Sequence, residues 1–203
     1  MIRMFIKRTL DLAISIAALL VLSVLMIFIA LCIYIRMGRP IFYTQIRAGQ
    51  GGQPFKIIKF RTMRNEMTKD GVKLTNEERV TKLGKILRKY SLDELPQLFN
   101  IIKGDISIVG PRPLLMDYVP LYNGEQARRL EVKPGLTGWA QVNGRNTLTW
   151  EEKFALDVWY VNHQSLWLDL KIIILTFVKV IKSDGVNQSN EVIVQRFTGS
   201  KEV

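Results

Sequence analysis

The chain has 203 residues, a formal net charge of +11 and a hydrophobic fraction of 48%, which suits one globular domain with an added membrane element. Cys32 is the only cysteine and His163 the only histidine, so an intramolecular disulfide and a Cys/His metal cluster are excluded. The positive charge suits nucleic acid or an anionic membrane, but the chain has no zinc-finger or RNP-type motif. We therefore expect no nucleic-acid partner, and an ordinary surface or core role for His163.

A long apolar run follows the first few residues. Residues 12–35 contain no charged side chain, and as a helix they would be about 36 Å long, which exceeds a hydrocarbon core of roughly 30 Å. This length favours membrane insertion. A cleaved signal peptide is the weaker interpretation, because the run is too long for one and no cleavage site of small residues follows it.

Basic residues flank the apolar run on both sides. Equal flanks fit poorly with a simple span, which usually has its positive charge on one side. A helix that enters the membrane and turns back is the alternative, and Ser23 could favour a bend by bonding to a backbone carbonyl. The composition leaves spanning and re-entry open, and it divides the chain into a membrane part, 1–37, and a globular part, 38–203. The flanking basic residues are Arg3, Lys7, Arg8, Arg36, Arg39 and Arg47.

The globular part is predicted to begin with two strands. Residues 55–63 alternate apolar and basic side chains, as a half-buried strand does. Residues 41–45 form a shorter strand, and the glycine-rich segment 48–54 between them predicts a turn.

Helices dominate the rest of the chain, so we expect an α/β fold that is mostly helical with a small sheet. The last helix is amphipathic and could either lie in the membrane interface or pack on the core. The expected elements are a polar loop with helical turns at 64–78, helices at 81–89, 93–103, 117–130, 150–163 and 165–182, a rigid loop at 110–113, and a loop with a short strand at 133–145.

Asp93 and Glu94 stand at the start of a predicted helix and have two interpretations. Ser91 and Glu94 match the S-x-x-E capping box, and acidic residues in a first turn are favoured by the helix dipole. The same carboxylates could instead carry chemistry. The sequence around them does not decide between capping and catalysis by itself.

Several other residues could surround an anion. Arg112 lies between two prolines that restrict its backbone, which suits bidentate phosphate binding, although a solvated loop arginine is the simpler alternative. Lys59 and Arg61 alternate with apolar residues on one strand face, a pattern that also fits a solvated face. Arg145 follows an Asn-Gly turn whose backbone amides could meet an anion. Asp157, in the middle of a helix, is either a surface acid or a carboxylate facing the site.

Carboxylates beside fixed cations suit phosphoryl transfer. Cations and a divalent metal offset the charge of a phosphoryl centre, and a carboxylate can attack phosphorus and form a covalent intermediate. Magnesium commonly binds one or two carboxylates together with substrate phosphates. The chain has neither a Walker loop nor a GxGxxG motif.

Three long motifs resemble the bacterial sugar transferase family, in particular the small monotopic phosphoglycosyl transferases of the PglC type. They are KFRTM at 59–63, SLDELPQLFNIIKGDISIVGPRP at 91–113 and KPGLTGWAQVNGR at 133–145. The resemblance implies transfer of a phospho-sugar from a UDP-sugar to polyprenyl phosphate, usually undecaprenyl phosphate. UMP would leave, and the reaction would pass through a phospho-sugar on an aspartate.

The resemblance also implies roles for individual residues. Asp93 matches the nucleophile and a Mg²⁺ ligand. Glu94 matches a second catalytic acid that would help proton transfer or place the acceptor, and Arg112 matches a phosphate-binding arginine. Further residues expected at the site, by position, are Lys59, Arg88, Arg145 and Asp157.

The family's membrane helix is re-entrant and broken near a Ser-Pro pair, where this chain has Ser23 and Val24. Because both flanks are basic, we still expect re-entry, at the cytoplasmic face of the inner membrane, with interfacial amphipathic helices. The expected partners are membrane lipid and the glycosyltransferases of later steps in glycoconjugate synthesis, such as protein glycosylation. The sugar would be N-acetylated or diacetamido. The alternatives are a transferase that starts capsule or O-antigen synthesis from UDP-glucose or UDP-galactose, and a non-enzymatic membrane scaffold.

Overall fold

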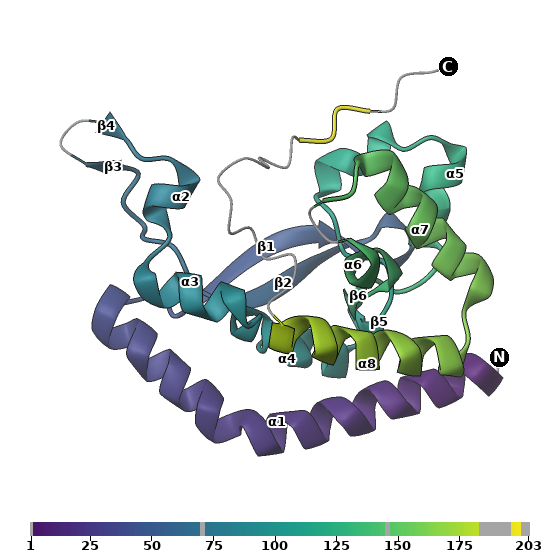
Figure 1. The fold of residues 1–203 in the computed structure, drawn as a ribbon, viewed down its shortest axis with the longest axis horizontal. Helices are drawn as coiled ribbons and strands as arrows, with labels where there is room; N and C mark the ends of the chain where they lie inside the picture. The colour runs from purple at the N-terminus through teal and green to yellow at the C-terminus, as the bar shows by residue number, and fades with distance from the viewer. Residues whose placement is uncertain (1, 70–71, 145–146, 183–195, 200–203) are drawn as a thin grey trace.

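The computed structural model of the protein describes residues 2–69, 72–144, 147–182 and 196–199. Helices dominate this part of the chain, and its strands form three two-stranded sheets. Figure 1 shows a long helix, α1, along one side of the molecule, with the other elements gathered above it. The prediction of a mostly helical fold with a small sheet is confirmed.

Helix α1 (Ile2–Met37) is the one helix in the described residues that is long and apolar enough to cross a membrane. It bends near its middle (Figure 1). There the Ser23 hydroxyl donates to the Leu20 carbonyl at 2.8 Å, which is the back-bond that the sequence suggested. One face of α1 packs on the globular part, and the other is exposed. The buried residues of α1 are Asp11, Ser15, Met26, Ile29 and Ile33.

Strands β1 (Phe42–Ala48) and β2 (Pro54–Phe60) form an antiparallel hairpin in which Phe42 pairs with Phe60. A single 3₁₀ turn, η1 (Gln50–Gly52), joins them, and its two glycines adopt φ values of 64° and 73°, which glycine tolerates at low cost. The two predicted strands and the turn between them are therefore confirmed, but β1 ends three residues later and β2 three residues earlier than expected.

The polar segment after β2 is more ordered than predicted. Strands β3 (Thr68–Lys69) and β4 (Val72–Lys73) pair antiparallel and project away from the body of the molecule at the upper left of Figure 1. Two capped helices follow, α2 (Asn76–Arg79) and α3 (Lys82–Lys89).

The centre of the molecule is built around a short parallel sheet. Strand β5 (Ser107–Val109) pairs with β6 (Gly135–Thr137). Gly110, directly after β5, lies so close to the second segment that a Cβ atom there would be 2.3 Å from the Lys133 carbonyl oxygen. Glycine is therefore required where the two segments meet.

Two predictions for the C-terminal half need correction. The helix predicted at 117–130 is divided, because Pro120 and the Asn123 capping box interrupt it, and the loop predicted at 133–145 contains a helix after β6. The helices predicted at 150–163 and 165–182 are confirmed. The elements are η3 (Met116–Leu121), α5 (Gly124–Ala127), η4 (Arg128–Leu130), α6 (Trp139–Asn143), α7 (Trp150–His163) and α8 (Leu166–Lys182).

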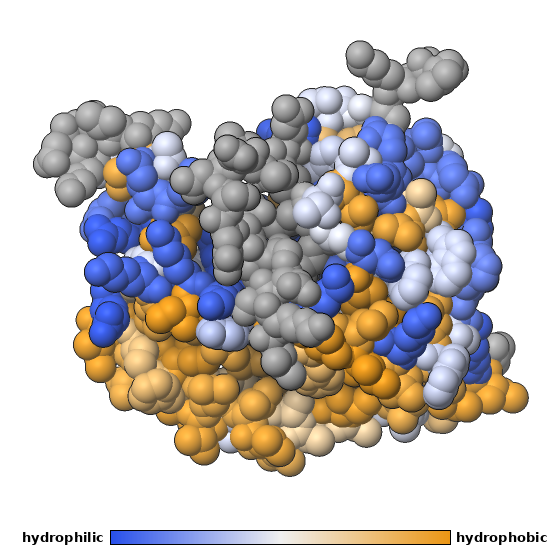
Figure 2. All heavy atoms as spheres, in the orientation of Figure 1, coloured by the Kyte–Doolittle hydropathy of each residue, from blue (hydrophilic) through white to orange (hydrophobic). Residues whose placement is uncertain are grey.

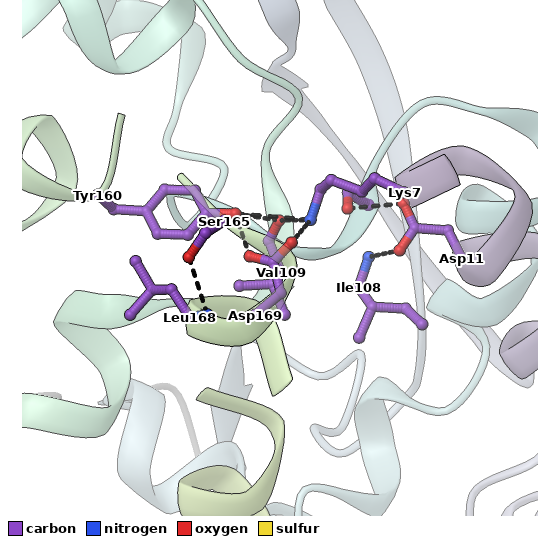
Figure 3. Close-up of polar contacts among 9 residues, drawn as sticks. Lys7, Asp11, Ile108, Val109, Tyr160, Ser165, Leu168 and Asp169 are labelled. Carbon is purple, nitrogen blue, oxygen red and sulfur yellow. Dashed lines mark hydrogen bonds and ion pairs between the residues drawn. The ribbon is translucent and has the colours of Figure 1, made fainter. Parts of the chain in front are cut away.

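The N-terminal end of α1 is tied to the globular part by charged side chains (Figure 3). Lys7 Nζ lies 2.6 Å from the Asp169 carboxylate on α8. The Asp11 carboxylate accepts from the Ser107 hydroxyl at 2.7 Å and from the Ile108 backbone N–H at 3.2 Å. These contacts join α1 to β5, the strand that leads to Arg112.

The C-terminal end of α1 is tied to the same body. The guanidinium of Arg61, after β2, donates to the carbonyls of Gly38 at 2.7 Å and Arg39 at 3.1 Å, and also to that of Met37. Arg61 is buried, so the interpretation of Lys59 and Arg61 as one solvated strand face is wrong. Arg61 instead satisfies helix-end carbonyls that would otherwise lack donors.

The surface is divided into an apolar and a polar side. Figure 2 shows the apolar side along α1 and α8, with polar residues above it. One face of α8 packs on the core, with Leu168 and Ile172 buried. The opposite face exposes large apolar side chains, so packing on the core is confirmed for one face, and contact of the other face with the membrane interface stays a prediction. The exposed residues are Trp167, Leu170, Ile174, Phe177 and Val178.

Candidate active site

Asp93 and Glu94 lie in a tight 3₁₀ turn, η2 (Leu92–Glu94), and not in a continuous helix. Helix α4 (Gln97–Lys103) begins only after Pro96. Ser91 has a φ of 54° and makes no side-chain cap, so the predicted Ser91–Glu94 capping box is wrong. Neither carboxylate is used to cap the helix, and both remain available for other contacts.

Glu94 binds two cations from distant parts of the chain. Its Oε1 atom lies 2.6 Å from Lys59 Nζ on β2 and 3.0 Å from Arg112 Nη2 in the loop after β5. Burial alone would raise the pKa of Glu94, but the charges and hydrogen bonds of Arg112 and Lys59 outweigh it and lower the pKa to about 2. Glu94 is therefore ionised at any physiological pH.

Asp93 has the opposite environment. It forms no salt bridge with any described residue. Burial and the negative charge of Glu94 raise its pKa, and the positive charges of Lys59 and Arg88 oppose this effect only in part. Asp93 is thus a carboxylate that lies near cations but is not neutralised by any of them.

Arg112 is presented by a restrained loop. The loop follows Gly110 and has a proline on each side of Arg112, and the Arg112 carbonyl accepts from Arg129 Nη2 at 2.7 Å. The side chain remains 48% exposed beyond its contact with Glu94. This combination of a fixed backbone and an accessible guanidinium suits binding of an external anion.

Arg88, near the end of α3, is a further cation close to Asp93. Its Nε donates to the Thr62 hydroxyl at 2.9 Å. Burial lowers its pKa, and the Asp93 charge opposes that effect. The structure therefore brings Lys59, Arg88 and Arg112 together around the Asp93–Glu94 turn.

Asp157 does not join this group. Asp157 is buried and paired with Arg129 at 2.8 Å, so it is neither a surface acid nor a carboxylate that faces the site. It lies behind Arg112, since the same Arg129 holds the Arg112 backbone. Arg145 lies outside the described residues.

Two arginines at the site were not predicted. Arg47 on β1 donates to Gln45 Oε1 at 2.6 Å and to the Pro113 carbonyl at 3.5 Å; burial and the nearby charge of Arg112 lower its pKa. Its alternation with Gln45 along the strand could have indicated a shared polar face. The second is Arg129, which no signal in the sequence distinguishes from its neighbour Arg128.

The geometry of the cluster suits an anionic phosphate substrate. One carboxylate without an ion pair lies near three cations, Lys59, Arg88 and Arg112, and the Arg112 side chain is half exposed. Within the described ranges no three Asp, Glu, His or Cys residues are grouped as a metal site, so a cation here would need substrate oxygens to complete its coordination.

Comparison with known proteins identifies the family. The family model for bacterial sugar transferases matches residues 2–183. The chain belongs to the bacterial sugar transferase family. It is a phosphoglycosyl transferase, and the resemblance found in the three sequence motifs is confirmed.

Individual members of the bacterial sugar transferase family cover the chain almost completely. An uncharacterized sugar transferase, EpsL, of Bacillus subtilis is 54% identical over 98% of this chain and 99% of its own length. An undecaprenyl-phosphate galactose phosphotransferase of Salmonella typhimurium is 40% identical over 89% of this chain but 41% of its own length. A UDP-glucose:undecaprenyl-phosphate glucose-1-phosphate transferase of Xanthomonas campestris is 40% identical over 86% of this chain and 38% of its own length.

Proposed function

We propose that this protein transfers a phospho-sugar from a UDP-sugar to polyprenyl phosphate and releases UMP. The observation that carries the proposal is the Asp93–Glu94 turn, where one carboxylate is held by two cations and its neighbour by none. The names of the Salmonella and Xanthomonas relatives refer to undecaprenyl phosphate, which supports the same reaction.

In the proposed reaction Asp93 is the nucleophile. Its carboxylate attacks the phosphorus that carries the sugar, the bond to the UMP oxygen breaks, and UMP leaves. A phosphate oxygen of the polyprenyl acceptor then attacks the same phosphorus and displaces the Asp93 oxygen, which regenerates the free carboxylate. Arg112, Lys59 and Arg88 offset the negative charge that gathers at the phosphorus.

Glu94 has a positioning role in this scheme. A carboxylate with a pKa of about 2 has almost no protonated form at neutral pH and is poorly suited to carry a proton. It instead holds Lys59 and Arg112 in place next to Asp93. Of the two roles implied by resemblance, placement of reacting groups is thus favoured over proton transfer.

Mg²⁺ would fit beside Asp93. This carboxylate forms no salt bridge in the described chain, and magnesium commonly binds one or two carboxylates plus substrate phosphates. Glu94 is the less suitable ligand because its oxygen is shared by two cations. Bound there, the ion would help neutralise the diphosphate; Arg112 and Lys59 would bind the remaining phosphate oxygens.

The membrane helix is proposed to re-enter the cytoplasmic face of the inner membrane. Both ends of α1 are tied to one globular body, through Lys7 and Asp11 at one end and Arg61 at the other. This arrangement favours both ends lying on one side of the bilayer. The polyprenyl acceptor also favours an active site at the membrane surface, because moving its hydrocarbon chain into water would cost about 0.8 kcal/mol per CH₂.

Two classes of sugar are candidates for the donor substrate. The resemblance to the PglC type favours an N-acetylated or diacetamido sugar, whereas the names of the Salmonella and Xanthomonas relatives refer to galactose and glucose. These names favour, as a second candidate function, the start of capsule or O-antigen synthesis from UDP-galactose or UDP-glucose. UMP release measured with a panel of UDP-sugars separates the two, and glycosyltransferases of later steps are the expected partners in either case.

The Asp93→Asn variant tests the nucleophile. We expect UMP release to fall by at least about 10⁴-fold, since an amide cannot form the intermediate. Radiolabelled sugar phosphate should remain on denatured wild-type protein and be absent from the variant. A variant with the wild-type rate would contradict the assignment, and phosphate-lipid binding by the wild type without any UMP release would favour the scaffold alternative.

A further inference from the structure

We propose that Phe197, near the C-terminal end, is a positioning residue for Arg112 and acts through Arg129. The inference rests on the proposed function, because it takes Arg112 as a ligand of the substrate phosphate. It concerns a segment distant in sequence from the three family motifs and from the Asp93–Glu94 turn.

Arg129 connects Arg112 to the interior. Its Nη2 donates to the Arg112 carbonyl at 2.7 Å, while Nε and Nη2 lie 3.0 and 2.8 Å from Asp157 Oδ2. Both members of the ion pair are 3% exposed. Because a buried pair with several hydrogen bonds has little freedom to move, it fixes the backbone from which the Arg112 side chain extends.

Two aromatic rings lie against the Arg129 guanidinium. Its carbon lies 5.7 Å from the ring centroids of both Tyr122 and Phe154, and Nη1 donates to the Tyr122 hydroxyl at 3.2 Å. A guanidinium next to aromatic rings gains cation–π stabilisation when water is excluded. The position of Arg129 therefore depends on these rings remaining dry and in place.

Phe197 packs against this aromatic group. Its ring centroid lies 5.0 Å from that of Phe154, 5.7 Å from that of Tyr118 and 6.1 Å from that of Tyr122, and the residue is 3% exposed. Phe154 and Tyr122 also pack on each other, but removing the Phe197 ring would leave a cavity against both of them and admit water beside Arg129. The effect would pass to the Arg112 carbonyl and displace the guanidinium in front of Asp93.

Phe197→Ala tests the inference in full-length protein in lipid nanodiscs, with UMP release as the readout. We expect kcat/KM for the UDP-sugar to fall roughly tenfold, mainly through KM, since small misplacements of a binding group are costly. Phe197→Leu, which keeps most of the apolar volume, should retain more activity. Arg196→Ala is the matched control, because its ion pair with Asp117 is exposed, and it should match the wild type.

An Arg112→Ala background distinguishes positioning from general loss of folding. If Phe197 acts through Arg112, adding Phe197→Ala to this background should lower kcat/KM by less than about twofold further. Equal losses in both backgrounds would overturn the inference, as would a Phe197→Ala protein with wild-type activity. If Phe197→Ala does not fold, the same comparison is made with Phe197→Leu.

The two proposals fail in different ways. A wild-type protein that releases no UMP from any UDP-sugar contradicts the proposed function and, with it, the role of Arg112. An active wild type that loses activity on Arg112→Ala, yet keeps its kcat/KM on Phe197→Ala, contradicts the inference about Phe197 alone.

Discussion

Two adjacent carboxylates in one turn have opposite electrostatic environments. The pKa of Glu94 is lowered to about 2 because Arg112 and Lys59 outweigh the effect of burial, whereas burial and the charge of Glu94 raise the pKa of Asp93. Neighbouring acids whose pKa values are separated in this way usually have separate roles. Here the pairing supports one acid that holds cations and one that reacts.

Glu94→Gln should shift the pH dependence of the enzyme. As the proposed nucleophile, Asp93 must be ionised to react, so its raised pKa would set the acid limb of the kcat/KM profile. Removing the Glu94 charge also frees Lys59 and Arg112 to attract Asp93, so this limb should move to lower pH. The rate at neutral pH should fall at least about tenfold, because the two cations lose their shared partner.

A profile of UMP release from pH 4 to 9 checks this expectation. Lys56→Gln provides the control, because Lys56 is an exposed residue of the same strand as Lys59. An acid limb that stays fixed or moves to higher pH in Glu94→Gln would show that Asp93 is not the group that titrates.

For single residues, the sequence predicted which residues lie at the site more reliably than it predicted which side chains contact one another. Asp93 and Arg112 were assigned by resemblance to family motifs, and the structure brings both to one place. The Ser91 cap was wrong because tertiary contacts with Lys59 and Arg112 outweigh a local hydrogen bond. Asp157 was misplaced because its pairing with Arg129 depends on helix packing that no spacing reveals.

At the scale of elements, periodicity predicted the long helices well. Helices α7 and α8 match their expected ranges: neither has an internal proline, α7 begins at a capping box on Thr149, and α8 has a clear apolar face. The division of 117–130 and the helix at Trp139–Asn143 were missed. Both lie among glycines, prolines and caps, where each short element is held by its neighbours and not by its own pattern.

The attachment of α1 to β5 can be tested at Asp11. Asp11→Ala would leave the Ser107 hydroxyl and the Ile108 N–H without their acceptor in a buried setting. The free energy of unfolding should fall by about 1–3 kcal/mol, which lowers the melting temperature in detergent by several degrees. Thr9→Ala, at an exposed position on the same helix, should change it little; an unchanged melting temperature for Asp11→Ala would contradict the contact.

On the scale of the whole molecule, the apolar face spans both α1 and α8 (Figure 2). A continuous exposed apolar face of this kind is typical of a surface that contacts lipid, and it would be unfavourable in water. Trp167 is 77% exposed on it. In nanodiscs, brominated lipids should therefore quench Trp167, and Trp167→Phe should remove most of the quenching. Trp150→Phe, in the aromatic group around Phe197, should leave the quenching largely intact, and equal effects would argue against interfacial placement of α8.

Topology can be tested with introduced cysteines in a Cys32→Ser background. Re-entry places the N-terminus and the segment after Gly38 on the cytoplasmic side. Arg3→Cys and Arg39→Cys should therefore resist an impermeant thiol reagent in intact cells and react after permeabilisation. Labelling of only one of the two in intact cells would indicate a spanning helix.

The attachment of α1 at both ends to a single body has a consequence for where the enzyme can work. A helix that crosses a bilayer must match its thickness and tilts or deforms the lipid when it does not. The re-entrant anchor proposed here, confined to one leaflet, would have no such length to satisfy. The depth of the catalytic cluster is then set by the protein's own framework, so the same enzyme should function equally well in membranes of short-chain and long-chain lipids.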